Sequence, residues 1–293
     1  MVMITDSQVH VWGDETPDRP WIPGGQERLR HMGHLPSLGV DYLVRKMDEG
    51  GIYRAVLVPP TWDQDRIDVA LEAWCQFPDR FRVMTRIPVN KPDEARKMLQ
   101  QLRGKPGVAG VRLTFSFEVE RDWIHDGTAD WFWPYAEEHD IPVMMLVPNG
   151  KDKVAKIAKA HPKLRIAIDH MGILGNTTDD RIAPYIDATV ALASHPNVTV
   201  KLSNIPSFST AGYPFANVMP HVQQLVKAFG AERCFWGSDF SRMLGKYGVD
   251  YKDGAALVTD HMSFLSQSEK ALILGDALCR WLRWDVSKPV DAS

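Results

Sequence analysis

The sequence predicts a (β/α)8 TIM barrel, in which eight parallel strands form a closed ring with helices outside. Short β-branched and apolar runs alternate with longer amphipathic stretches over most of the 293 residues. Runs such as 55–58 and 143–147 are almost continuously apolar, which is typical of strands covered on both faces. A doubly wound open sheet is the alternative, but its glycine-rich turn after the first strand is missing.

Each apolar run predicts one strand and each gap one helix. The strands are expected at 3–12, 54–60, 82–89, 108–114, 142–148, 165–171, 198–204 and 234–240. The helices are expected near 38–49, 64–77, 92–103, 130–139, 152–161, 180–194, 217–229, 255–266 and 268–282.

No Ser/Gly tract, charge block or longer repeat interrupts this alternation, so residues 1–293 are expected to form one domain. The first connection, about residues 13–37, is unusually long for a compact domain. We expect it to act as a lid, and residues 241–254 after the last strand are a second lid candidate.

The composition and net charge of the chain limit the kinds of molecule that it is expected to bind. Hydrophobic residues make up 44% and charged residues 24% of the chain, as in an ordinary globular protein. The net charge of -3 argues against attraction of the whole domain to nucleic acid or to an anionic membrane. No secretion signal or membrane-spanning segment is recognisable, and Cys75, Cys234 and Cys279 lack the spacing of a zinc or redox motif. We expect a cytoplasmic protein with reduced, mostly buried thiols that acts on a small molecule.

Active sites of such barrels lie at the carboxyl ends of the strands. By strand alternation, Asp6, Gln8 and His10 share one face of the first strand, while Val9 and Val11 share the other. The two valines should meet the helices, so Gln8 and His10 are expected in the barrel mouth. A polar side chain buried there must be paired or functional, and a hydrogen-bonded core histidine is the structural alternative.

Later strands add charged candidates. Arg112 ends the fourth strand and could bind a substrate carboxylate, or form a buried ion pair with a neighbouring strand. Arg86 has an equivalent place on the third strand with less support around it. His170 continues the alternation of the isoleucines of the sixth strand and should face inward, whereas Asp169 is expected to bond backbone or a helix.

Asp239, at the end of the eighth strand, is the strongest single candidate. Burial after so apolar a strand should raise its proton affinity and suit it to general base catalysis, although nearby Arg or His side chains would oppose that shift. Capping of the following helix is the alternative. His221 and His261 are expected on solvated helix faces, and the aromatic residues of 123–135 are expected to pack. No P-loop, nucleophile elbow or His-Glu-x-x-His motif is present.

Five strand-end motifs, taken in order, carry a family resemblance. They are Asp6-Ser-Gln-Val-His-Val-Trp12, Gly110-Val-Arg-Leu113, Ile168-Asp-His-Met-Gly172, Val200-Lys-Leu-Ser203 and Trp236-Gly-Ser-Asp239. The first is similar to the Asp-x-His-x-His-x-Trp motif of the amidohydrolase superfamily. The set resembles its amidohydrolase-2 branch, which includes lactonases acting on pyrone dicarboxylates and sugar lactones, over nearly the whole chain.

The resemblance implies a hydrolase that opens a lactone or related cyclic ester of a small, carboxylate-bearing substrate. Asp239 would activate water and pass the proton to the leaving oxygen, with His10 and His170 as further catalytic residues. The substrate contacts it implies are Gln8, Arg112 and Trp12.

The sequence departs from the family pattern at its metal ligands. Gln8 stands where the family's first strand has a histidine, and the fifth strand lacks the histidine of metal-binding members. A bound zinc or manganese would have only His10, His170 and Asp239, so we expect no required cofactor. A metal-dependent decarboxylase of an aromatic or unsaturated acid and a non-catalytic ligand-binding barrel are the alternatives. Family members are often oligomeric, so a homo-oligomer is possible.

Overall fold

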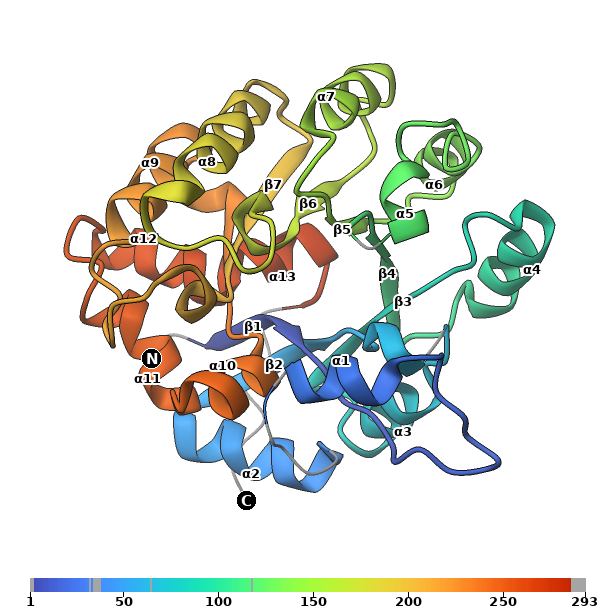
Figure 1. Ribbon diagram of the computed structural model, residues 1–293, viewed down its shortest axis with the longest axis horizontal. Coiled ribbons are helices and arrows are strands. Elements are labelled where there is room, and N and C mark those ends of the chain that lie inside the picture. Colours follow the sequence, from blue (N-terminus) through green and yellow to red (C-terminus); the bar gives the residue numbers. More distant parts are fainter. Residues whose placement is uncertain (1–2, 32, 34–37, 64, 117, 286–293) are drawn as a thin grey trace.

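The computed structural model describes residues 3–31, 33, 38–63, 65–116 and 118–285. Eight parallel strands follow one another around a single sheet in chain order, and helices surround them (Figure 1). The last strand meets the first where the amide of Asp239 donates to the carbonyl of Gln8 at 3.0 Å. The predicted (β/α)8 barrel is confirmed.

Each strand lies on a predicted run, but all except β4 end earlier than predicted. The strands are β1 (Ile4–Val9), β2 (Ile52–Leu57), β3 (Phe81–Thr85), β4 (Val108–Thr114), β5 (Val143–Leu146), β6 (Ile166–Ile168), β7 (Val198–Ser203) and β8 (Cys234–Gly237). The residues just beyond these ends leave the hydrogen-bonded ladder and form the mouth. Gln8 and Arg112 still lie within strands, whereas strand alternation no longer applies to the candidates beyond the strand ends, which are His10, Arg86, His170 and Asp239.

Most helices between the strands match the predicted positions. They are α2 (Val40–Gly50), α3 (Asp68–Gln76), α4 (Pro92–Leu102), α6 (Phe132–Glu138), α7 (Lys151–Ala160), α8 (Ala183–Val190) and α9 (Met219–Phe229). Three helices lie in the long connections: α1 (Gly25–His31), α5 (Glu118–Asp122) and α10 (Phe240–Tyr247). Short 3-10 turns occur at η1 (Thr61–Asp63), η2 (Asp169–Gly172), η3 (Asp179–Ile182), η4 (Ala191–Ser194), η5 (Ile205–Phe208) and η6 (Ala231–Arg233).

The helices after β8 differ from the prediction. The helix expected at 255–266 is α11 (Tyr251–Thr259), which begins earlier because the Asp250 side chain accepts from its first amide. His261 consequently lies in a turn and not in a helix. The helix expected at 268–282 is divided into α12 (Gln267–Ala271), a π-helical turn η7 (Leu272–Asp276) and α13 (Ala277–Leu282).

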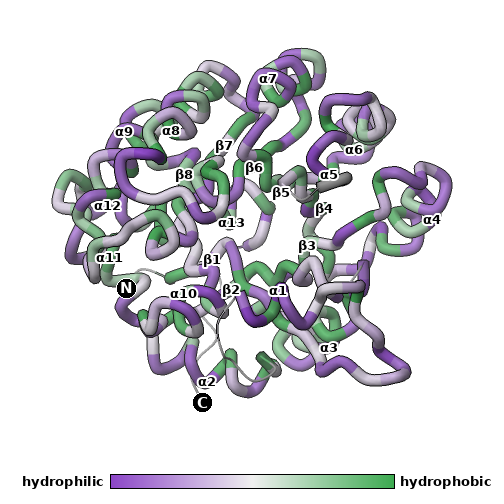
Figure 2. The backbone as a smooth tube through the Cα atoms, in the orientation of Figure 1, coloured by the Kyte–Doolittle hydropathy of each residue, from purple (hydrophilic) through white to green (hydrophobic). Residues whose placement is uncertain are grey.

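The core has two layers separated by the strands. Inside the barrel, alternate strand residues pack together with residues of α13, which lies at the centre of the view in Figure 1. The inner layer includes Val56, Val58, Met84, Met144, Ala167, Phe235, Leu278 and Cys279. A larger outer layer fills the space between strands and helices, and it contains Val9 and Val11 as predicted. Figure 2 shows hydrophobic residues along several of the strands, and hydrophobic residues alternating with hydrophilic ones along the outer helices.

The first connection is held against its neighbours where it is described. Arg19 forms an ion pair with the buried Asp63 of η1. A Cβ atom on Gly33 would lie 2.1 Å from the carbonyl carbon of Gly245, so this connection touches α10 in the second lid candidate. Residues 32 and 34–37 of the predicted lid lie outside the described residues.

Two further expectations concerned membrane-spanning segments and the cysteine thiols. Within the described part of the chain, no helix has the length and apolarity needed to cross a membrane. All three cysteines are free, with Cys234 and Cys279 buried and Cys75 exposed.

Candidate active site

His10 and Asp239, predicted to share the mouth, are in contact. The Nδ1 atom of His10 lies 2.6 Å from the carbonyl oxygen of Val58, and because a carbonyl only accepts, Nδ1 carries the proton. The Nε2 atom lies 3.4 Å from Oδ1 of Asp239 and 3.4 Å from Nε2 of Gln8. Gln8, His10 and Asp239 therefore form one cluster, as the sequence analysis expected.

Asp239 sits at the turn from β8 into α10 with a left-handed backbone, φ 52°. Its side chain does not cap the helix, and within the described chain its Oδ1 has no hydrogen-bond partner beyond the His10 contact. Burial raises the pKa of this carboxyl, but the hydrogen bond and charge of His10 and the charges of His170 and Arg242 outweigh it and lower the pKa to about 2. The expected rise in proton affinity is wrong because the neighbouring cationic groups dominate over burial.

His170 reaches the site by a route that strand alternation does not describe. Ile166 and Ile168 lie in the outer core, while Ala167 faces the barrel interior. His170 and Met171 then adopt left-handed conformations, with φ 52° and 57°. This turn brings His170 inward, where its Nδ1 lies 2.8 Å from Oγ of Ser203. His170 faces inward as predicted, but strand alternation, the reason given for that prediction, does not explain it.

Two side chains hold that turn in place. Thr189 donates to the carbonyl of Met171 at 3.0 Å, and Lys151 donates to the carbonyls of Gly172 and Pro148. Lys151 is buried, and this burial lowers the pKa of its amine to about 7. Residues in the left-handed region are strained unless their surroundings fix them, and these bonds do so. The sequence analysis missed Lys151, which looks like an ordinary helix-start residue.

The sequence analysis expected Asp169 to bond backbone or a helix, and this prediction is wrong. Its Oδ2 lies 3.0 Å from Nε of Arg112 and its Oδ1 lies 2.8 Å from Nζ of Lys201. Burial raises the pKa of Asp169, but Lys201 and Arg112 hold it well below its usual range. Because β6 ends at Ile168, Asp169 turns into the barrel interior and completes a buried ion-pair network.

Arg112 forms a buried ion pair, as the alternative expectation held, but with Asp169 of the turn after β6 and not with a neighbouring strand. Besides Asp169, it donates to Oγ1 of Thr114 at 2.6 Å. Arg86 also donates to Oγ1 of Thr114, at 3.1 Å, and no described carboxylate lies within 4 Å of its guanidinium. Burial and the charge of Arg112 lower the pKa of Arg86 to about 10, partly opposed by Glu120. The sequence ranked Arg86 below Arg112, yet of these two buried arginines only Arg112 has a carboxylate partner among the described residues.

Lys201, on β7, was quoted in a motif but assigned no role. It is fully buried, and its Nζ donates to Oε1 of Gln8 at 2.8 Å as well as pairing with Asp169. Burial lowers the pKa of the nearby His170 to about 4, because the opposing charges of Asp239 and Asp169 are weaker. At neutral pH His170 is therefore uncharged, and the positive charge around it comes from arginine and lysine.

Asp6 does not share a face with Gln8 and His10, because the pairing of β1 with β2 shifts register between Asp6 and Val9. Its carboxylate accepts from the amides of Gln8 and Ser238, each at 2.9 Å, from the Ser238 hydroxyl, and from the Tyr251 hydroxyl at 2.7 Å. Burial raises the pKa of Asp6 to about 6 in spite of these bonds. Asp6 therefore ties the ends of β1 and β8 together behind the cluster.

Trp12 lies apart from the polar network. It is 1% exposed and packs edge-on against Trp62 with ring centroids 5.3 Å apart. Its role in substrate contact stays a prediction.

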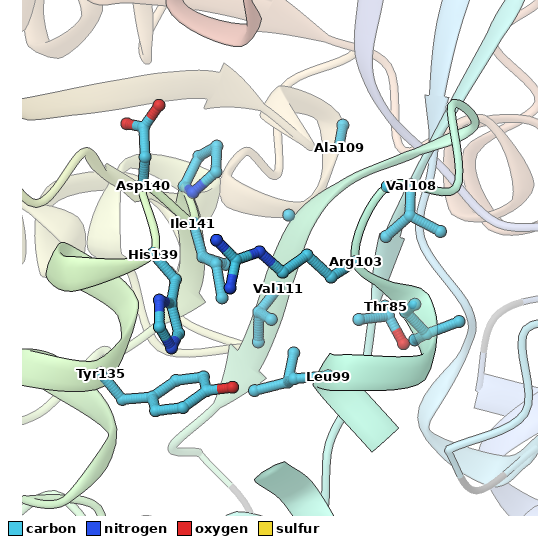
Figure 3. Close-up of a pocket in the computed structure, with 14 residues that line it drawn as sticks. Thr85, Leu99, Arg103, Val108, Ala109, Val111, Tyr135, His139, Asp140 and Ile141 are labelled. Carbon is cyan, nitrogen blue, oxygen red and sulfur yellow. The ribbon is translucent and has the colours of Figure 1, made fainter. Parts of the chain in front are cut away.

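Other features lie away from the mouth. The aromatic residues near α6 pack on one another as expected, for example Trp131 on Tyr135. A cavity of about 230 Å³ lies outside β4, where Leu99 and Arg103 face Tyr135 and His139 (Figure 3). Its lining contains none of the residues of the mouth.

The donor set does not fit a metal ion. Within the described ranges, no three His, Cys, Asp or Glu side chains come together in a way that could hold one. His10 and Asp239 are in contact, but the third group beside them is the amide of Gln8, which presents its nitrogen to His10. An amide nitrogen is a donor and cannot ligate a cation.

Comparisons with known proteins agree with this architecture. A family model described as amidohydrolase matches residues 5–283. An L-fucono-1,5-lactonase from Burkholderia ambifaria is 26% identical over 291 residues, which is 97% of each chain. A Burkholderia multivorans amidohydrolase structure with bound zinc has a TM-score of 0.79 at 22% identity, covering 96% of this chain and 99% of that one.

A probable 2-pyrone-4,6-dicarboxylic acid hydrolase from Acinetobacter baumannii, solved with citric acid bound, has a TM-score of 0.74 at 19% identity. The alignment covers 96% of this chain and 99% of that one. The family resemblance carried by the strand-end motifs is thereby confirmed. The chain belongs to the amidohydrolase family and is an enzyme of the amidohydrolase type.

Proposed function

We propose that this enzyme hydrolyses a lactone or related cyclic ester of a small, carboxylate-bearing substrate, with Asp239 activating water and no metal ion required. The observation that carries the proposal is the buried Asp239 carboxylate, whose Oδ1 has no described hydrogen-bond partner beyond its contact with His10, in a mouth that also holds a buried arginine without a described carboxylate partner. The similarity to an L-fucono-1,5-lactonase supports ring opening as the reaction.

In the proposed reaction, Asp239 accepts a proton from water as the water oxygen bonds to the lactone carbonyl carbon. The carbonyl oxygen becomes an oxyanion, and the bond from the carbonyl carbon to the ring oxygen then breaks. Asp239 returns the proton to that leaving oxygen, which yields the hydroxy acid. Its pKa of about 2 keeps Asp239 ionised at neutral pH but makes it a weak base.

The oxyanion needs donors that are in place before the reaction. When the Ser203 hydroxyl donates to Nδ1 of His170, the neutral ring carries its proton on Nε2 and presents it as a donor. General base catalysis typically contributes about 10²- to 10⁴-fold, and a weakly basic carboxylate lies at the low end of this range. Electrostatic stabilisation of the oxyanion by preorganised donors therefore supplies the larger share.

In this proposal, Arg86 binds the carboxylate of the substrate. A buried guanidinium without a carboxylate partner is costly, and a bidentate bond to a substrate carboxylate would relieve that cost. Arg112 cannot do this as well because its Nε is already bonded to Asp169. We therefore assign the role first expected of Arg112 to Arg86, with Arg112 supporting it through the shared Thr114 hydroxyl.

The test is hydrolysis of a panel of lactones, with and without a ring carboxylate, by the wild type, Asp239→Asn and the exposed-site control Asp260→Asn. We expect Asp239→Asn to lower kcat by at least about 10²-fold while an acidic lactone still binds, since the general base is lost and Arg86 remains. Asp260→Asn should behave as the wild type. Retention of most activity by Asp239→Asn would remove Asp239 from the mechanism.

The same panel decides between the alternatives. Turnover that chelation abolishes and zinc or manganese restores, on aromatic acids and not on lactones, would point to a decarboxylase. Binding of lactones without hydrolysis by the wild type would point to a ligand-binding barrel.

A further inference from the structure

The Gln8 amide is oriented by a buried ammonium. Lys201 donates to Oε1 of Gln8 at 2.8 Å. An ammonium group has donors only, so the oxygen of the amide must face Lys201 and the nitrogen must face away. That nitrogen lies 3.4 Å from Nε2 of His10. The contact with Lys201 thus decides which end of Gln8 meets the histidine.

His10 keeps the arrangement of a metal-binding histidine without the neighbour that would share the ion. Its Nδ1 proton is bonded to the Val58 carbonyl, as is usual for metal ligands, which leaves the Nε2 lone pair for the ion. In this protein the Nε2 atom instead faces the N–H group of Gln8 on one side and Asp239 on the other. A donor therefore occupies the direction from which a second ligand would come.

The carboxylates on either side of Gln8 have partners on the protein. Asp169 pairs with both Lys201 and Arg112, and Asp239 contacts His10. A divalent ion would have to enter beside the Lys201 ammonium, which is separated from His10 by the single Gln8 amide.

We propose that the Gln8–Lys201 pair takes the place of a metal ion in this barrel: the Lys201 ammonium balances Asp169 and fixes the Gln8 amide so that its nitrogen, which cannot ligate an ion, lies against Nε2 of His10. The two residues act together, so neither replacement alone restores a metal site. This inference deepens the metal-independent hydrolysis proposed above and rests on it for its role in the reaction. Its structural content, the exclusion of an ion, is testable without any substrate.

The experiment measures zinc bound per chain in the wild type, Gln8→His, Lys201→Met and the double variant Gln8→His/Lys201→Met. Each protein is equilibrated with zinc chloride, desalted and assayed by elemental analysis, with circular dichroism and a thermal melt to verify folding. A matched control, Gln8→His/Lys270→Met, removes a different buried lysine, which donates to the carbonyl of Thr259 and does not contact Gln8.

We expect about one zinc per chain in the double variant and little in the other four proteins. Retention of about one zinc by the wild type would overturn the proposal, and so would equal binding by Gln8→His and the double variant. Should the double variant not fold, the wild type and Gln8→His still decide the question, because about one zinc per chain in either of them would overturn the proposal. If zinc follows the expected pattern and no lactone is hydrolysed, the proposed function fails and this inference stands.

Discussion

Arg86 offers a sharp test of the proposed site because its replacement should change stability and activity in opposite directions. Arg86 is 8% exposed, and its guanidinium has a single described hydrogen bond, to Thr114. We expect Arg86→Met to make the protein more stable at neutral pH and to impair turnover of acidic lactones. Methionine has a similar length and needs no polar partner.

The size of the effect follows from the pKa of Arg86, which burial lowers from 12.5 to about 10. At about 1.4 kcal/mol per unit, holding this charge in the site costs on the order of 3 kcal/mol. For a base with a lowered pKa, the cost is fully present below the folded-state pKa, so it applies at pH 7. Thr114 keeps its bond from Arg112, so the replacement leaves no orphaned hydroxyl. We expect a gain of about 1–3 kcal/mol in the free energy of unfolding.

The same charge should contribute to substrate binding. A loss of about 3 kcal/mol of carboxylate recognition corresponds to about 10²-fold in kcat/KM for an acidic lactone. A neutral lactone of the same ring should change by less than about threefold, because it has no group that Arg86 recognises. Urea unfolding measures the first effect and paired-substrate kinetics the second.

Arg112→Met is the matched control, since it breaks an ion pair with Asp169 and should lower the free energy of unfolding, although Asp169 keeps Lys201 as a partner. The reasoning about Arg86 is wrong if Arg86→Met is destabilised to the same degree. It is also wrong if acidic and neutral lactones lose activity equally.

Two further predictions concern residues that hold the site from behind. Asp6→Asn should become more stable relative to the wild type as pH rises from 4 to 7, by up to about 3 kcal/mol, as urea unfolding at each pH would show. The reason is that the pKa of Asp6 is raised from 3.8 to about 6, so the stabilisation that Asp6 gives in acid is lost as pH rises through 6. A stability difference between Asp6→Asn and the wild type that does not change with pH would contradict this reasoning. Lys151→Met should lower kcat at least about tenfold with little change in KM, because the turn carrying His170 loses its bonds, whereas the exposed Lys156→Met should not. The pKa of the Lys151 amine is lowered from 10.5 to about 7, so the wild type should also gain stability relative to Lys151→Met as pH rises from 7 to 10. If the wild type shows no such gain, the amine is not buried in solution.

Much of the fold could be predicted from the sequence because a barrel is encoded by local patterns. Apolar runs such as Val143–Leu146 need no knowledge of the rest of the chain to be identified as strands. The places of His10 and Asp239 at strand ends followed from the same patterns. Helix bounds failed after β8, where caps such as Asp250 decide the start.

Pairing between charged side chains could not be predicted, because it joins residues far apart in the sequence. Arg112 and Arg86 occupy equivalent positions at the ends of adjacent strands, and only the turn after β6 determines which of them forms an ion pair with Asp169. That turn depends on Thr189 and Lys151, which come from two other elements. The pKa of Asp239 likewise depends on which cationic groups the barrel brings to it.

The sequence by itself determined the barrel, the family and the polar residues available at the strand ends, since these depend on periodicity and on short motifs. The tertiary structure alone decided which arginine remains unpaired, which way Gln8 points and how His170 enters the mouth. Those outcomes arise from hydrogen bonds and Coulomb interactions across the barrel, whose strength depends on distance and burial and not on separation along the chain.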